Sequence, residues 1–206
     1  MNTIATHDPL PLRLPQAQSG TTLPAGLRLA DAAMLDFNSQ LHGVHHDAPQ
    51  VEAAQIEGLA AWLQSLPPDT MAATIELRLA RAESLRRMLD DADWDVPADV
   101  ALRGRRLVDY IHHRHDLIPD DMPQLGHLDD ALLVELSWSE FDGEVRDYLD
   151  YRRWCARTPV RGTAFERRAA WEADCLAEAS ALIQRQEVRS RGYSAFAPLT
   201  RSFRVC

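Results

Sequence analysis

The chain contains no lysine, and all 22 of its basic residues are arginine. This absence excludes chemistry that needs a lysine amine, such as a Schiff base or the phosphate-binding lysine of a P-loop. The 31 acidic residues outnumber the arginines and leave a net charge of −9. Because neutralisation of phosphates supplies most of the affinity of general nucleic-acid binders, this balance argues against a nucleic-acid partner.

Cysteines and long apolar runs are also scarce. The three cysteines (Cys155, Cys175 and Cys206) are far apart and form no CxxC pair, which fits a reducing compartment better than a disulfide scaffold. Residues 1–28 lack the basic start and apolar stretch of a signal peptide. No run reaches the roughly 18–20 apolar residues that span a bilayer. We therefore expect a soluble, cytoplasmic protein without a transmembrane segment.

No segment shows the alternation of β-branched and polar residues that is typical of strands. Apolar residues recur instead three or four positions apart, which is the spacing of helices. The sequence predicts an all-α fold, a compact bundle of about six helices. Helices are predicted at 29–41, 50–66, 70–90, 144–157 and 163–189, besides those around residue 118. The inner row predicted for the last of these helices is Phe165, Ala169, Leu176, Ala179 and Ile183.

Composition divides the chain into three regions. Residues 1–26 are rich in proline and predict a flexible arm, residues 27–189 predict a single helical domain, and residues 190–206 form a tail. The tail is rich in arginine and aromatic residues and contains no acid. It predicts a segment that binds an acidic partner surface, or nucleic acid by charge and stacking, with a contact on the protein's own acidic face or disorder as the alternative. The residues that would bind are Arg189, Arg191, Tyr193, Phe196, Arg201, Phe203 and Arg204.

A segment rich in histidine, proline and aspartate occupies residues 109–141, inside the predicted domain. A helix must end before Pro119, because the residue before a proline disfavours the α conformation. Pro119 and Pro123 then frame a tight turn in which Gly126 is free to adopt a positive φ angle. An apolar helix follows from about residue 128. A pair of aspartates lies in its first turn, where acidic residues interact favourably with the helix dipole.

This segment resembles the YkvA-like family, a domain of unknown function. The family's hallmark is an aspartate, an Ile-Pro-Asp step, a second proline, a glycine and then paired aspartates before an apolar helix. The resemblance implies a helical module and no established reaction. Many family members carry a long apolar segment after the paired aspartates and associate with membranes, whereas acidic residues interrupt that segment here. The matching positions are Asp116, Ile118, Pro119, Asp120, Pro123, Gly126, Asp129 and Asp130.

Histidines and aspartates of the same segment are candidate metal ligands. Imidazole and carboxylate groups suit zinc, manganese or iron, and a bound metal would activate water for hydrolysis. The alternative interpretation is that the acids cap helices and interact with their dipoles, since HHxHD is not an established zinc motif. The candidates are His112, His113, His115, Asp116, Asp120, Asp129 and Asp130.

Three functions remain open, because no nucleophile elbow, P-loop or dinucleotide fingerprint is present. The first is a non-catalytic interaction or regulatory domain that needs no cofactor. It holds a protein partner through its tail or through its acidic connector, which is the segment with Pro119 and Pro123 that joins the two helices. The second is a metal-dependent, hydrolase-like enzyme centred on residues 112–130. The third is a peripheral membrane protein that docks through the helix at 128–141.

Overall fold

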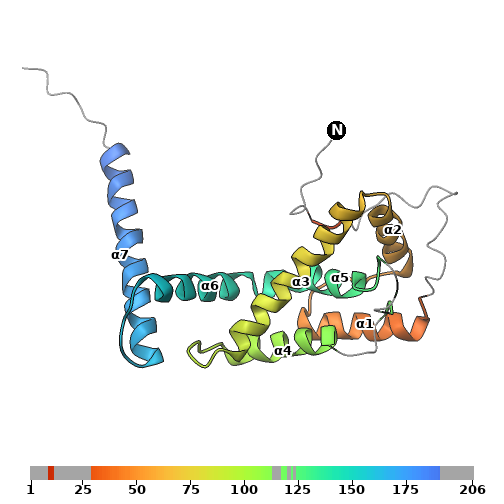
Figure 1. The fold of residues 1–206 in the computed structure, drawn as a ribbon, viewed down its shortest axis with the longest axis horizontal. Helices are drawn as coiled ribbons and strands as arrows, with labels where there is room; N and C mark the ends of the chain where they lie inside the picture. Colours follow the sequence, from red (N-terminus) through yellow and green to blue (C-terminus); the bar gives the residue numbers. More distant parts are fainter. Residues whose placement is uncertain (1–8, 12–28, 113–116, 120–121, 123, 191–206) are drawn as a thin grey trace, which may run out of the picture. The chain divides into compact units, whose positions relative to one another are not determined.

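The computed structural model of the chain describes residues 9–11, 29–112, 117–119, 122 and 124–190 (Figure 1). These residues form seven α-helices and one short 3-10 helix, and none of them lies in a strand. The predicted all-α fold is therefore confirmed. The helices are α1 (Asp31–Val44), α2 (Ala53–Gln64), α3 (Pro68–Asp90), α4 (Ala98–His112), α5 (Leu128–Ser137), η1 (Trp138–Glu140), α6 (Asp142–Arg157) and α7 (Ala164–Ser190).

Local signals explain where α2 and α3 begin. At the start of α2, the side chain of Gln55 accepts a hydrogen bond of 2.8 Å from the backbone N–H of Glu52, and the two residues form a capping box. Pro67 precedes α3 and Pro68 is its first residue, a position where the missing N–H of proline costs nothing. Both boundaries lie close to those predicted from the sequence.

The core of the bundle is built around α5, which contacts α1, α3 and α4. Burial of each aliphatic side chain of this kind stabilises a fold by about 1.5–3 kcal/mol. The apolar side chains of this helix, which is part of the segment 128–141 through which membrane docking is predicted, lie inside the bundle. The buried apolar residues of α5 are Leu128, Ala131, Leu132, Leu133 and Val134, each at most 1% exposed. Among the described helices, none is both long and apolar enough to cross a membrane.

Within the region predicted as a flexible arm, the structure describes residues 9–11. Leu10 is buried there, and its backbone N–H donates a hydrogen bond of 3.4 Å to Oε1 of Glu135 on α5. The flexible arm over residues 1–26 stays a prediction.

The chain divides into two compact units, Met1–Arg152 and Arg153–Cys206, where the sequence predicted one domain over 27–189. The second unit contains α7. Trp171 of α7 is buried, and Asp174 accepts a hydrogen bond of 2.8 Å from the indole of Trp154. The predicted inner row of this helix is on a different face and is exposed, so that prediction is wrong.

Candidate functional site

Asp129 fastens the connector between α4 and α5 to the bundle. Its Oδ2 accepts hydrogen bonds from the backbone N–H groups of Leu117 (2.8 Å) and Ile118 (3.2 Å) and from the hydroxyl of Tyr110 (3.2 Å). The carboxylate is fully buried. Charge-assisted hydrogen bonds of this kind are stronger than those between neutral groups. Asp129 therefore joins α4, the connector and α5 at one point.

Tyr110 is the hydroxyl donor at this junction. Burial, together with the negative charges of Asp129 and Asp130, raises the pKa of Tyr110 well above its usual value. The phenol therefore stays protonated and donates its hydrogen to the carboxylate. Its ring also packs edge-on against Phe37 of α1, with 6.1 Å between the ring centroids. Through these two contacts, Tyr110 and Asp129 are part of the packed framework of the bundle.

In the turn of the connector, the residue with a positive φ angle is not the one that the sequence predicted. Among the described residues, positive φ angles occur at Gln124 (72°) and Gly162 (142°), so the expectation of a positive φ at Gly126 is wrong. Gly126 is buried, and its N–H donates a hydrogen bond of 3.0 Å to the carbonyl of Met122. Gln124 is exposed, so its side chain can leave the turn while the backbone takes the left-handed conformation.

The candidate metal ligands fall into two groups. His113, His115, Asp116 and Asp120 lie outside the described residues, as does Pro123 of the predicted turn. His112, Asp129 and Asp130 are described. In the part of the chain that the structure describes, no three histidine, cysteine or acidic side chains are grouped so that they could hold a metal ion. Nδ1 of His112 instead donates a hydrogen bond of 2.7 Å to the carbonyl of Val108.

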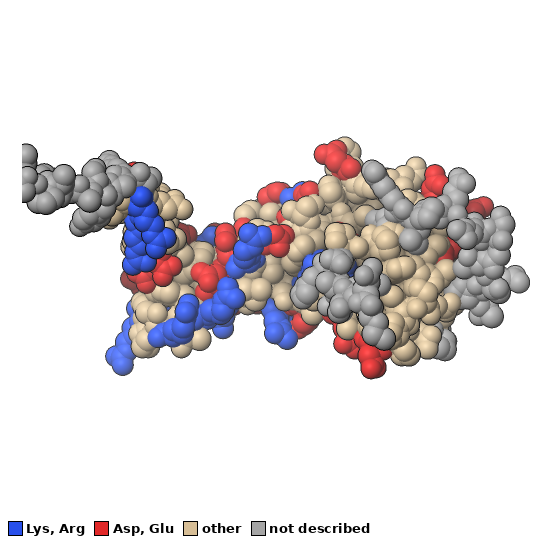
Figure 2. Space-filling view, turned by 90° about the horizontal axis from the view of Figure 1, so that it is seen from above, with Lys and Arg blue, Asp and Glu red and all other residues tan. Residues whose placement is uncertain are grey.

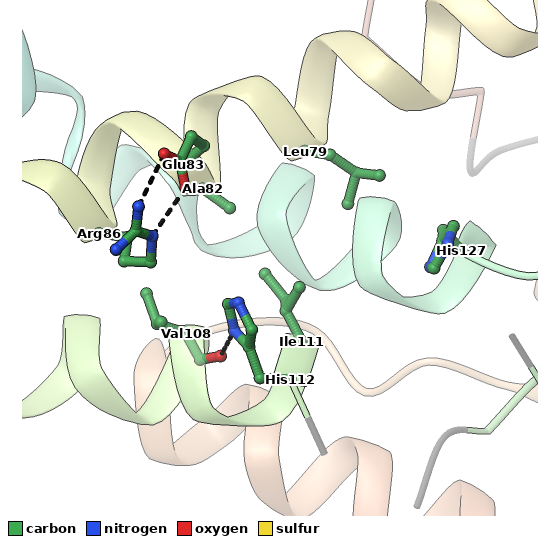
Figure 3. Close-up of a pocket in the computed structure, with 8 residues that line it drawn as sticks. All are labelled: Leu79, Ala82, Glu83, Arg86, Val108, Ile111, His112 and His127. Atoms are coloured by element: carbon green, nitrogen blue, oxygen red, sulfur yellow. Dashed lines mark hydrogen bonds and ion pairs between the residues drawn. The ribbon is translucent and has the colours of Figure 1, made fainter. Parts of the chain in front are cut away.

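A groove of about 170 Å³ lies between α3 and α4, near the start of α5 (Figure 3). Its apolar surface comes from both helices, and charged or titratable side chains stand around it. The volume is below the roughly 300–1,000 Å³ of typical small-molecule sites. The groove therefore accommodates a few atoms of a ligand or a single side chain. Its lining residues are Leu79, Ala82, Glu83, Arg86, Val108, Ile111, His112 and His127.

His127 and Asp130 form a dyad at the edge of this groove. Nδ1 of His127 lies 3.2 Å from Oδ2 of Asp130. The imidazole is half exposed, whereas the carboxylate is 1% exposed. A buried carboxylate that orients an imidazole is an arrangement that general bases use. The sequence analysis missed His127, although its spacing of three residues from Asp130 was the available signal.

Glu83 and Arg86 form a bidentate ion pair on the α3 side of the groove. Nε of Arg86 lies 2.7 Å from Oε2 of Glu83, and Nη2 lies 2.9 Å from Oε1. The hydrogen bonds from Arg86 and Arg87 lower the pKa of Glu83 to about 2. A third guanidinium nitrogen of Arg86 lies 3.0 Å from Asp90. The arginine charge at this groove is therefore already matched by carboxylates.

The second candidate surface is a row of exposed apolar residues on α7. Phe165, Leu176 and Ile183 are 82%, 69% and 58% exposed. They are eleven and seven residues apart, so they lie on one face of the helix. We call them the α7 row. Large exposed apolar residues that gather on one surface are typical of protein interaction sites. The sequence spacing was correct, but it could not show that this face would remain uncovered.

On the face of the described residues that Figure 2 shows, charge does not single out another surface. On the face that Figure 2 shows, arginine side chains and carboxylates are interspersed, with wide uncharged areas between them. Of the residues predicted in the tail, Arg189 is described and lies in the last turn of α7. The other tail candidates, Arg191, Tyr193, Phe196, Arg201, Phe203 and Arg204, lie outside the described residues.

Comparison of the chain with protein-family models, with curated proteins and with solved structures returns no match. The resemblance of residues 116–130 to the YkvA-like family therefore stays a prediction. What the geometry adds is a structural role for one hallmark residue, since Asp129 binds the backbone of the connector.

Proposed function

We propose that the protein is a non-catalytic interaction domain that holds a protein partner through the α7 row. The observation that carries this proposal is the exposure of Phe165, Leu176 and Ile183 on one face of a 27-residue helix. Within the connector, which the sequence offered as a binding surface, the backbone N–H groups of Leu117 and Ile118 are bound to Asp129. The interaction function is retained, and its surface moves to α7.

The free energy gained by burying exposed apolar side chains favours a partner for this helix. Isolated helices are only marginally stable in water, and helices in proteins gain most of their stability from packing of an apolar face. Each exposed side chain of the α7 row would gain about 1.5–3 kcal/mol on complete burial. At 1.5 Å per residue, α7 is about 40 Å long and offers room for a partner helix or an extended segment.

The chemistry of α7 favours a protein over a lipid surface. Its five acidic residues outnumber its four arginines. Glu172 lies four residues before Leu176, and Glu187 lies four residues after Ile183, so both carboxylates share the face of the α7 row. Anionic lipid would be repelled there. We propose that the interaction takes place in the reducing cytoplasm, a location that the wide spacing of the three cysteines favours.

Site-specific photo-cross-linking in the protein's own cells tests the proposal. A photoreactive residue replaces Leu176 or Ile183, and a matched control carries it at Leu102, which is 74% exposed on α4. We expect a defined cross-linked protein from the two α7 positions and none from the control. Equal cross-linking from all three positions, or none from α7, would refute an α7 interface.

A metal-dependent, hydrolase-like enzyme is the second candidate, and the His127–Asp130 dyad beside the groove is the observation that favours it. An ion that binds only the folded state at a hundredfold excess over Kd would stabilise it by about 2.7 kcal/mol. Thermal melting with zinc or manganese, compared between the natural chain and Asp130→Asn, separates the candidates. The interaction proposal expects no metal-dependent shift, and the enzyme candidate expects one that Asp130→Asn removes.

A further inference from the structure

The segment that joins α6 to α7 is rich in arginine. Of the 22 arginines and 31 acids of the chain, five arginines and one acid lie in residues 153–168. This segment therefore has a net charge of +4 in a chain whose net charge is −9. All of it belongs to the second compact unit of the protein.

The partners of these arginines, rather than their density, distinguish them from other arginines of the interspersed surface in Figure 2. Arg87 on α3 and Arg146 on α6 are exposed, and each forms an ion pair with a carboxylate one turn away. Arg157 and Arg161 are also exposed, but neither forms an ion pair with a carboxylate in the part of the chain that the structure describes. Nε of Arg157 donates instead to the carbonyl of Arg153 (3.3 Å), which carries no net charge. Two guanidinium charges are thus available to the carboxylates of another molecule.

Glu166, the acid of this segment, takes part in the cap of α7. Its Oε2 accepts hydrogen bonds from the backbone N–H (2.8 Å) and the hydroxyl (3.1 Å) of Thr163, which hold the pKa of Glu166 below its usual value. Gly162 precedes this cap at a φ angle of 142°, and its carbonyl accepts a hydrogen bond from Arg167. The turn is therefore fixed by its own hydrogen bonds, and Arg161 stays exposed at its edge.

An exposed aromatic residue follows these charges. Phe165 begins the α7 row, is 82% exposed and comes four residues after Arg161. The indole of Trp154 donates a hydrogen bond of 2.8 Å to Asp174, so the end of α6 that carries Arg157 contacts α7. The end of the α7 row that begins with Phe165 therefore combines an apolar group with positive charge.

We propose that Arg157, Arg161 and Phe165 form a docking surface for an acidic, apolar segment of the protein partner. The inference rests on the proposed function and names the chemistry of the partner. An apolar side chain of the partner covers Phe165, and its carboxylates pair with the two arginines. Guanidinium groups suit this role, because their planar shape binds carboxylates in a bidentate manner. The charge also orients the partner, with its acidic end at the start of α7.

The remainder of α7 favours a protein over a nucleic acid. Bases stack on aromatic side chains, whereas the α7 row continues from Phe165 with the aliphatic residues Leu176 and Ile183. Residues 169–190 carry four acids and two arginines. A phosphate backbone that followed the helix would therefore meet net negative charge, and neutralised phosphates supply most of the affinity of nucleic-acid binders.

Binding of designed peptides to the purified full chain tests the proposal. The probe is a fluorescein-labelled helical peptide of about 18 residues, long enough to cover the roughly 27 Å from Phe165 to Ile183. It carries leucine along one face and glutamate beside it at one end, and a second peptide has glutamine in place of each glutamate. Fluorescence anisotropy should show at least about tenfold tighter binding of the glutamate peptide, with a difference that shrinks at high salt. Equal affinities, or no binding of either peptide, would overturn the proposal.

Paired charge changes supply the matched control. Arg157→Gln with Arg161→Gln should weaken binding of the glutamate peptide by about fivefold or more. Arg87→Gln with Arg146→Gln removes the same charge from arginines that are 67% and 68% exposed and already paired, so affinity should stay within about twofold. Equal losses in the two double variants would refute the docking surface. Tighter binding of oligothymidine than of the glutamate peptide would assign the surface to nucleic acid and refute it as well.

The two proposals fail in different experiments. If a partner cross-links at Leu176 and Arg157→Gln with Arg161→Gln leaves its yield unchanged, the α7 interface stands and the acidic partner is refuted. If no partner cross-links at Leu176, the interface in cells is refuted, and the peptide measurement still decides whether this surface binds acidic, apolar segments. If both proposals hold, the double variant lowers the yield of the cross-linked partner, and the control variant does not.

Discussion

The hydroxyl of Tyr110 lies 3.2 Å from the carboxylate of Asp129, where α4, the connector and α5 converge. Both residues are buried, and the same carboxylate oxygen binds two backbone N–H groups of the connector. A buried acid of this kind can be mistaken for a catalytic or metal-binding residue from sequence. Its geometry identifies it as part of the framework, and two predictions follow from that role.

Replacement of Asp129 by asparagine should lower the free energy of unfolding by about 2–3 kcal/mol, because charge-assisted hydrogen bonds to a buried acceptor are lost. Denaturant unfolding measures the change. Asp99→Asn is the matched control, since Asp99 is also a first-turn acid but is 73% exposed beside Arg103. The control should leave stability nearly unchanged. Similar losses in both variants would mean that Asp129 acts only on the helix dipole.

The raised pKa of Tyr110 makes stability depend on alkaline pH. In the unfolded chain a tyrosine ionises near pH 10, whereas folded Tyr110 keeps its proton. The folded state therefore binds more protons above about pH 10, and stability falls as pH rises through this range. Tyr110→Phe removes this titration and should show a shallower fall. Tyr148, whose pKa is also raised by burial, accounts for part of the remaining slope.

Unfolding of the natural chain and of Tyr110→Phe at several pH values between about 8 and 11 provides the measurement. At neutral pH the variant should be about 1 kcal/mol less stable, because Asp129 loses its hydroxyl donor. Parallel curves for the two proteins across the alkaline range would show that Tyr110 ionises equally in both states.

A buried ion pair supplies the third prediction. Arg78 of α3 is fully buried, and its Nε lies 3.1 Å from Oε2 of Glu135. Glu135→Gln leaves the guanidinium without this carboxylate and should cost about 3 kcal/mol. Arg81 contacts the same oxygen at 3.1 Å but is partly exposed, so Arg81→Met should cost less than about 1 kcal/mol. The double variant Arg78→Met with Glu135→Leu should regain stability relative to Glu135→Gln. A further loss in the double variant would show that the charges themselves are required.

The conformation of Gln124 supplies the fourth prediction. At a φ angle of 72°, a β-branched residue is disfavoured more strongly than glutamine. Gln124→Val should therefore lower stability by about 1–2 kcal/mol, whereas Gln124→Asn should leave it unchanged or raise it slightly, because asparagine tolerates this region. Gln124 is exposed, so loss of packing does not complicate the comparison. Equal melting temperatures of the two variants would contradict strain at this turn.

The amino-acid sequence by itself determined the helices of this protein. Apolar spacing of three and four residues, the prolines at 67 and 68 and the absence of strand patterns place the helices within a few residues of their observed bounds. These signals are local, because a helix depends on residues within about one turn of each other. For the same reason, the acids at 129 and 130 were correctly placed in the first turn of a helix.

Only the tertiary structure decided which of these patterns form the core and which residues are near one another. The rows of α5 and α7 look alike in sequence, yet the apolar residues of α5 are buried and the α7 row is exposed. Burial depends on whether another helix is available to cover a face, and that depends on long-range packing. The bond between Asp129 and the backbone at residue 117 likewise requires the turn between them to close. Periodicity records which side of a helix is apolar, and it does not record what lies opposite.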